Sequence, residues 1–535
     1  MATDEMNTRC AGCDRRDFLV KLGLLAGFGA VSDDLLAMLP PAVAPDLIPS
    51  KAGAVKVRLV FAYHKDGEVQ VKPDWPNVGY DFRPVMKNIT DTLNLKVRGV
   101  EFLPVHCVDD VDAAKLVDAD EKAGEIKGYM FVQLNCWNKC ILAWNRTKKP
   151  VFYTPLPYAG DGGWLKHNSQ LMNLDVPYYA SFAAFDFSKV VEVARAFEVL
   201  AEGGDGPAFK ARALAIRNSL IPPDRLPEDL KVVDDRLACL SPEATLEKLR
   251  GMRILSVQRE VDAKFAQEVR QTFGIELERV TFDEVKAASR AVADEAARAV
   301  STGWAKAARR VEYVDDATLL GCAKMYLGMK AVLAKHGAQA ITIDCLGGCY
   351  TGILDAYPCL GFMQLQDDGL MGVCENDLRS TLTMLVFRAL SGRTGYVSDP
   401  ALDMPNRAIS YAHCVSTRRF FGPQGAESPF EIQSHSEDRK GASVRAFAPV
   451  GVPVTTVLVD PGRRALTLHT GIVTGNDTDD RACRTKIIAR VTGDYSKIER
   501  TWHSFGWHRV TFLGDFRADV EKLAAKIGYK VVYES

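Results

Sequence analysis

Short apolar runs alternate with polar stretches of helical spacing through the first part of the chain. Apolar runs such as 57–63 and 151–154 are typical of strands buried on both faces, and stretches such as 113–123 are typical of the helices between them. This alternation predicts a doubly wound (Rossmann-like) α/β domain over residues 51–240. Its predicted strands are 57–63, 97–105, 128–134 and 151–154.

A second doubly wound unit is predicted over residues 241–395. It begins with a β–α–β pattern, and Gly337 is expected to end its longest helix. A further helix, 378–390, follows a glycine-rich approach. The expected order is strand 253–257, helix 262–273, strand 274–280, alanine-rich helix 282–310, helix 316–336 and strand 337–344.

The last part, residues 396–535, changes to short β segments punctuated by Gly and Pro. This pattern predicts a smaller β-rich domain, antiparallel and barrel-like. The expected β segments are 443–447, 454–459, 465–470 and 485–491, followed by a helix at 515–527 and a strand at 529–533.

Composition narrows the class of protein. The chain has 535 residues, with 47% hydrophobic and 25% charged residues, which is ordinary for a soluble protein of several domains. Disorder, collagen-like repeats and a polytopic membrane protein are therefore excluded. With 67 basic and 68 acidic residues the formal charge is −1, so no electrostatic footprint for nucleic acid is present.

The thirteen cysteines are irregularly spaced and do not predict a disulfide scaffold. Cys10 and Cys13 form at best half of a zinc site. Cys345 and Cys349 flank Leu-Gly-Gly directly after a predicted strand. We expect small residues lining a cleft in a strand-end loop there, with a redox or zinc role as the alternative.

The N-terminus carries Arg15-Arg16, a short apolar stretch at 22–30 and small residues at 42–44. These features fit a Tat export signal, and an ordinary amphipathic helix is the alternative. We set residues 1–50 aside as signal and linker. The expected location is periplasmic, or otherwise exported by the Tat pathway, with no stable membrane insertion after export, because the apolar stretch is too short to span a bilayer.

Two acids and one histidine stand out beside predicted turns. Glu375 precedes an apolar helix, Asp399 ends a strand-like run before a proline, and His508 lies in an aromatic segment. Each has an ordinary structural explanation: a helix N-terminal charge, a turn, or a buried histidine. Together they would make an oxygen-rich site with one imidazole, which suits Mn²⁺ or Mg²⁺ better than structural zinc.

Several segments resemble the L-fucose isomerase / L-arabinose isomerase superfamily, and the C-terminal half of L-fucose isomerase most closely. The resemblance covers about residues 340–530, and before it only the β/α order agrees. Trp507 departs from the family, whose members usually carry a polar residue before the metal histidine. The matching segments are Cys374-Glu375-Asn376-Asp377, Thr381-Leu382-Thr383-Met384, Asp399, His413-Cys414, 449–455, Cys483-Arg484-Thr485, Gly506-Trp507-His508 and Gly514-Asp515-Phe516.

The resemblance implies a metal-dependent aldose–ketose isomerase that acts on a monosaccharide through an ene-diol. It implies that Glu375 and Asp399 are both metal ligands and the acid/base pair, and that His508 is the third ligand. The implied metal is Mn²⁺, or Mg²⁺ or Co²⁺, and the implied assembly is a homo-oligomer, a trimer or hexamer. His413 is expected beside the ligands or simply buried, and Trp502 and Trp507 are expected to stack on a sugar or to pack in the core.

Two other classes of function remain open from the residues. One is an exported carbohydrate-binding protein without catalysis. The other is a related metal-dependent epimerase or aldolase-type enzyme on the same fold. Export is unusual for a sugar-catabolising isomerase, whereas the presence of both acids and the histidine argues against binding alone.

Overall fold

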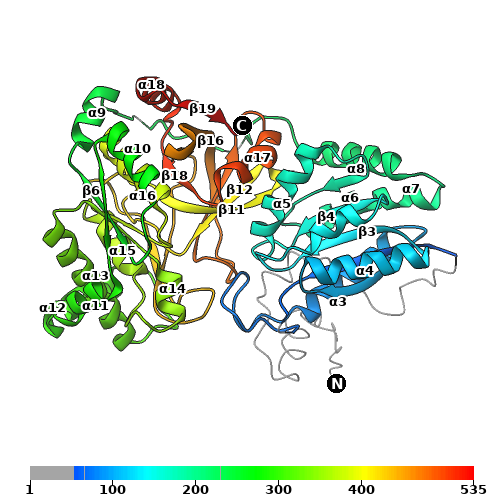
Figure 1. The fold of residues 1–535 in the computed structure, drawn as a ribbon, viewed down its shortest axis with the longest axis horizontal. Helices are drawn as coiled ribbons and strands as arrows, with labels where there is room; N and C mark the ends of the chain where they lie inside the picture. The colour runs from blue at the N-terminus through cyan, green and yellow to red at the C-terminus, as the bar shows by residue number, and fades with distance from the viewer. Residues whose placement is uncertain (1–52, 66, 229, 236) are drawn as a thin grey trace, which may run out of the picture.

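The computed structural model describes residues 53–65, 67–228, 230–235 and 237–535. The predicted Tat signal and the Cys10–Cys13 pair lie outside this part of the chain. The described chain forms an N-terminal α/β domain, a central α/β unit and a barrel between them (Figure 1).

The N-terminal domain is a parallel sheet of five strands in the order β2-β1-β3-β4-β5. From residue 57 onward β1, β3, β4 and β5 are largely buried, as the apolar runs predicted, because helices pack on both sides, whereas the edge strand β2 is partly exposed. The strand order reverses between β1 and β3. The elements are β1 (Val55–Ala62), α3 (Arg83–Lys96), β2 (Val100–Cys107), α4 (Asp110–Ala123), β3 (Ile126–Gln133), η2 (Cys140–Arg146), β4 (Val151–Pro155), α5 (Asp161–Leu174), β5 (Tyr179–Ser181), α6 (Phe187–Ala194), η3 (Arg195–Phe197), α7 (Glu198–Ala201) and α8 (Gly206–Leu220).

The central unit is a parallel sheet in the order β10-β9-β6-β7. Gly337 takes a left-handed backbone, φ 59°, and ends the longest helix, which confirms the predicted helix stop. The elements are α9 (Pro242–Leu249), β6 (Arg253–Val257), α10 (Ala263–Phe273), β7 (Glu276–Val280), α11 (Phe282–Arg290), α12 (Asp294–Ala307), β8 (Val311–Glu312), α13 (Asp316–His336), β9 (Ala340–Ile343), α14 (Cys345–Tyr350), α15 (Cys359–Asp367), β10 (Met371–Val373) and α16 (Leu378–Ser391).

Two predictions for the central unit are wrong in detail. The expected single helix over 282–310 is broken between α11 and α12, where Ala293 is extended. No Gly or Pro marks that break, so local propensity could not reveal it. The segment after β9, expected as a loop, is the short helix α14. Its Gly348 lies where a Cβ would meet Leu354, so the glycine serves close packing.

The last part of the chain forms a closed barrel of six antiparallel strands. The order is β15-β18-β11-β12-β17-β16, and β15 pairs with β16 to close it, while β19 adds to β16 in parallel. The predicted segment 443–447 lies outside the barrel, because β14 pairs with β13, which in turn pairs with β8 of the central unit. The elements are β11 (Tyr396–Asp403), η4 (Met404–Asn406), β12 (Ala408–His413), β13 (Phe430–Gln433), β14 (Ser443–Ala446), β15 (Pro453–Asp460), η5 (Pro461–Arg463), β16 (Ala465–Asn476), β17 (Thr485–Val491), α17 (Ser496–Thr501), η6 (Trp502–Phe505), β18 (Arg509–Leu513), α18 (Arg517–Ile527) and β19 (Lys530–Tyr533).

Buried polar contacts attach the N-terminal domain to the barrel. Tyr158 donates from its hydroxyl to Asp477 at 2.6 Å, and Arg217 forms an ion pair with Glu499. Both partners of that ion pair are almost fully buried, so separating the domains would leave charges unpaired. The domain is therefore held in one place relative to the strands that carry the site.

Candidate metal centre

Three neighbouring barrel strands bring Asp399, His413 and His508 together. Asp399 lies within β11, His413 is the last residue of β12, and His508 directly precedes β18. β11 pairs with β12 on one side and β18 on the other, so the three residues belong to one patch of the barrel. Asp399 was expected at a strand end, but β11 continues through Pro400. The pairing with β18 stops at Ser398, so the missing N–H of Pro400 interrupts no ladder on that side.

Glu375 comes from a loop of the central unit, between β10 and α16. Both Glu375 and Asn376 have a left-handed backbone, with φ values of 63° and 52°. The conformation is held from outside, because Asn376 donates from its backbone N–H to Ile343 and from its side chain to Val257, each at 2.8 Å. Non-glycine residues in this region are uncommon and cluster at functional sites. Glu375 is thus more than a charge at a helix start.

The four side chains point at one another. His508 Nε2 lies 3.1 Å from Asp399 Oδ1 and 3.5 Å from Glu375 Oε2. His413 Nε2 lies 3.8 Å from Glu375 Oε1 and 4.0 Å from Asp399 Oδ2. The Glu375 side chain is 28% exposed, whereas that of Asp399 is 7% exposed. The cluster is therefore reached by solvent from the Glu375 side.

The donor set fits a divalent cation. Asp399 Oδ1 is buried, and its ion-pair partner among the described residues is His508 Nε2, at 3.1 Å. Such an oxygen needs a positive partner. Neighbouring ligands of an octahedral ion stand roughly 3 Å apart, given metal–oxygen bonds of ~2.1 Å, and the contacts of His508 with the two acids are close to that spacing. Glu375, His413 and His508 also offer ligand atoms that all lie within 4.8 Å of one another.

Asp377 supports the cluster, and the sequence assigned it no role. It caps α16 through the backbone N–H groups of Arg379 and Ser380, and its Oδ2 lies 2.9 Å from His508 Nδ1. A carboxylate on the far nitrogen of a ligand histidine fixes the ring and its tautomer. The only signal for this role was the position of Asp377 in the Cys–Glu–x–Asp pattern before a helix.

The charges of the cluster act on one another. Burial opposes a charged imidazole, yet Asp399 and Glu375 raise the pKa of His508 well above its usual value. Burial raises the pKa of Glu375, although His508 and His413 oppose the shift. Burial also disfavours the charged form of Asp377, but the hydrogen bond with His508 lowers the pKa of that carboxyl below its usual value. Without a cation, the imidazole therefore carries the positive charge that the acids require.

His413 and two cysteines form the inner wall of the site. His413 is 1% exposed, and its Nδ1 lies 3.4 Å from Cys374 Sγ and 3.8 Å from Cys414 Sγ. Cys345, singled out from the sequence, accepts a hydrogen bond from the backbone N–H of Glu375 at 3.3 Å. These thiols thus pack under the loop and the histidine.

The two tryptophans differ in their surroundings. Trp502 is buried, donates from Nε1 to the Trp507 carbonyl and lies under the Arg509 guanidinium, 4.4 Å from its ring centroid. Those contacts correspond to core packing. The Trp507 ring is only partly buried and meets the edge of Trp137 at 5.6 Å. Of the two, Trp507 is the one whose ring is partly exposed, and it faces the N-terminal domain at Trp137 and Gly162.

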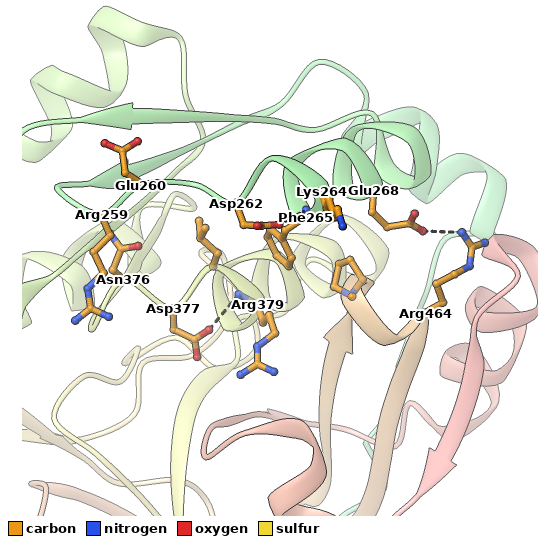
Figure 2. Close-up of a pocket in the computed structure, with 13 residues that line it drawn as sticks. Arg259, Glu260, Asp262, Lys264, Phe265, Glu268, Asn376, Asp377, Arg379 and Arg464 are labelled. Carbon is orange, nitrogen blue, oxygen red and sulfur yellow. Dashed lines mark hydrogen bonds and ion pairs between the residues drawn. The ribbon is translucent and has the colours of Figure 1, made fainter.

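A pocket of about 790 Å³ opens between the start of α10 and the start of α16 (Figure 2). It is lined by Asn376 and Asp377 and by charged side chains of both signs, among them Arg259 and Arg379. Asp377 therefore connects this pocket with His508. The acids and bases in the lining balance, so the pocket favours neither sign of charge.

Comparison with known proteins gives one partial likeness. No family model matches the chain. Over 102 residues it is 28% identical to the sulfoquinovose isomerase of Alkalicoccus urumqiensis, a stretch that spans 19% of this chain and 23% of that protein. The chain is thus similar in part to a sugar isomerase, and its barrel contains a candidate metal site.

Proposed function

We propose that the protein is a metal-dependent aldose–ketose isomerase that acts on a monosaccharide through an ene-diol. The observation that carries the proposal is the convergence of Glu375, Asp399 and His508 around one buried carboxylate oxygen. The partial likeness to a sugar isomerase supports the same class of reaction. Glu375, Asp399 and His508 would hold the cation.

Aldose–ketose isomerisation requires the transfer of protons between the two neighbouring carbons C1 and C2 and between their oxygens. A bound divalent cation supplies polarisation of the sugar carbonyl and stabilises negative charge on its oxygen. Glu375 is suited to carry the proton, since it is the more exposed acid and burial raises its pKa. Asp399 is held within strand β11, so it suits the role of a stationary ligand and partner acid opposite Glu375. Asp377 keeps the His508 ring in place through its Nδ1.

Finer properties of the enzyme belong to the same proposal. The site residues agree with those of the L-fucose isomerase / L-arabinose isomerase superfamily, and we propose membership in it with Mn²⁺, or Mg²⁺ or Co²⁺, as the metal. A trimeric or hexameric assembly and Tat-dependent export to the periplasm are proposed on the same resemblance and on the N-terminal Arg15-Arg16 pattern.

A deuterium-exchange experiment tests the function. The full chain is incubated in D₂O with Mn²⁺ and a panel of aldopentoses, aldohexoses and deoxy-sugars, and deuterium at C2 and ketose formation are followed by NMR. We expect exchange with at least one sugar, loss of exchange in Glu375→Gln, and no change in Glu427→Gln, a partly exposed control acid paired with Arg419.

The outcomes separate the alternatives. Exchange with formation of a C2 epimer and no ketose would indicate an epimerase, and cleavage products would indicate an aldolase-type enzyme. Sugar binding without exchange across the whole panel would contradict the isomerase and leave a binding protein.

A further inference from the structure

Polar side chains gather where the strand order of the N-terminal sheet reverses. His64 lies two residues after β1, and Asn135 lies two residues after β3. Asp74 joins them from the loop that follows β1. In open α/β sheets, ligands bind outside the carboxyl ends of the strands at the point of reversal. These three residues, the His64 cluster, therefore occupy the position where a ligand of this domain is expected.

The His64 cluster is held in a fixed geometry. Asp74 Oδ2 accepts a hydrogen bond from Asn135 Nδ2 at 2.8 Å and lies 3.1 Å from His64 Nε2. Asn135 Nδ2 lies 2.8 Å from the same imidazole nitrogen. Asp74 Oδ1 accepts from the backbone N–H of Trp75 at 2.8 Å, which orients the carboxylate. The Asn135 amide nitrogen thus donates to Asp74 and also lies against the His64 ring.

The carbonyl side of Asn135 is left without a partner. Asn135 is 1% exposed, and its Oδ1 has no hydrogen-bond partner among the described residues. Buried acceptors in proteins are nearly always satisfied, so an orphan of this kind points to a group that the protein alone does not supply. Asn135 Oδ1 therefore requires a hydrogen-bond donor from outside the protein. His64 lies beside Asn135, and its side chain is 27% exposed, so solvent reaches the cluster from the His64 side.

The His64 cluster lies across from the metal centre. Trp137, two residues after Asn135, meets the ring of Trp507 at 5.6 Å, and Trp507 adjoins His508. A Cβ built at Gly162 would approach both Cys136 Sγ and the Trp507 ring, so the loop after β3 and the metal-ligand segment nearly touch there. Burial raises the pKa of the Cys136 thiol, and Asp74 and Asp399 raise it further, so the residue next to Asn135 lies near both carboxylates.

We propose that His64, Asp74 and Asn135 bind hydroxyl groups of the sugar on carbons beyond the reacting C1–C2 pair, while the metal centre holds that pair. This inference rests on the proposed function and names its substrate class: a polyhydroxylated sugar with no anionic group at the distal end. A hydroxyl can donate to Asn135 Oδ1 and accept from an imidazole N–H at once, which a carbonyl or an apolar group cannot do. The Asp74 carboxylate would repel an anion.

The test compares a full-length sugar with a truncated one. His64→Gln and Asn135→Ser remove members of the cluster, and His336→Gln is the matched control, since His336 ends α13 in the central unit and pairs there with Glu278 and Glu284. With Mn²⁺ present, kcat/KM is measured for the best aldose of the panel and for C2 exchange into glycolaldehyde, which has only the two reacting carbons. Binding of ribitol, galactitol and sorbitol is measured by calorimetry. Thermal unfolding checks that the variants are folded.

We expect His64→Gln and Asn135→Ser each to lower kcat/KM for the full-length sugar about tenfold or more, mainly through KM, and to weaken polyol binding by a similar factor. Glycolaldehyde exchange and the His336→Gln control should stay within about twofold of the wild type. Equal losses for both substrates, or no loss for either, would overturn the assignment. If the wild type exchanges no sugar, the isomerase proposal fails, and the polyol titrations still decide on the His64 cluster: failure of every polyol to bind the wild type, or equal binding by the variants, refutes it.

Discussion

The barrel and the loop before α16 hold their parts of the site in different ways. Asp399 and His413 stand on adjoining strands of a closed barrel, and His508 directly precedes the strand on the other side of Asp399. Glu375 stands on a short loop with two consecutive left-handed residues, held by hydrogen bonds to the ends of two central strands. The comparison teaches that one side of the site is fixed by the fold itself, while the other depends on a few local contacts.

The largest effect should follow from removing the acid on the loop side. Glu375→Gln keeps the size of the side chain but removes the proton carrier and one charge facing the cation. We expect the rate of sugar exchange to fall by about 10²- to 10⁴-fold. Because the side chain is partly exposed, the unfolding midpoint in denaturant should change little. A large fall in the unfolding midpoint would contradict this expectation and show that Glu375 stabilises the fold.

The barrel side should instead show its importance in stability. Glu534, which directly follows β19, is fully buried between Arg509 and His469, and Arg509 Nη2 donates to Glu534 Oε1 at 2.6 Å. Glu534→Gln leaves a buried guanidinium without its counter-charge, which costs about 3–5 kcal/mol in such pairs. Urea unfolding of the variant and the wild type measures this difference. A change below about 1 kcal/mol, the range of an exposed pair, would contradict it.

The same glutamate predicts acid sensitivity of the barrel. Burial opposes its ionisation, but Arg509 and His469 lower its pKa to about 2, below the 4.5 of the unfolded chain. Its stabilising contribution, about 3 kcal/mol from the size of that shift, is therefore present above about pH 4.5 and is lost as the pH falls toward 2. Unfolding free energies at pH 6 and pH 3 should differ more in the wild type than in Glu534→Gln.

A smaller effect is expected for the residue that links the two sides. Asp377 begins the helix after the loop and touches His508 of the barrel segment. Asp377→Asn keeps a capping oxygen but weakens the hold on the ring, and we expect a 10- to 100-fold loss of Mn²⁺ affinity. Calorimetric titration measures it. Ser241→Asn, at another helix cap remote from the cluster, is the control and should bind Mn²⁺ like the wild type.

The smallest effect concerns backbone strain in the loop. Asn376→Ala removes a side chain that bonds Ser256 and Val257 and places alanine at φ 52°, whereas Asn376→Gly relieves the strain. A left-handed non-glycine residue costs roughly 1–2 kcal/mol. We expect Asn376→Ala to lower activity about tenfold, and Asn376→Gly to retain more of it. Equal loss in both variants would assign the effect to the lost side-chain bonds alone.

The sequence revealed the layers of the fold better than the details of the site. Apolar runs and glycine punctuation predicted both parallel sheets and the barrel, because burial of strands and the stop at Gly337 are local effects. The break between α11 and α12, the backbone of Glu375 and the pairing of Asp377 with His508 depend on contacts between distant segments. The His64 cluster was missed for the same reason, since two loops that are distant in the sequence must meet before its geometry exists.

The central claim is that one divalent cation is held by both sides of the site, and Mn²⁺ binding tests it most directly. The full chain is freed of metal with a chelator and titrated with Mn²⁺, with free ion followed by electron paramagnetic resonance, for the wild type, Glu375→Gln, Asp399→Asn and His508→Gln. His503→Gln, in the same aromatic segment, is the control. The account predicts one site per chain in the wild type and the control, and a loss of affinity of about tenfold or more in each of the other three. Unchanged binding in those three variants, or no binding by the wild type, would contradict it.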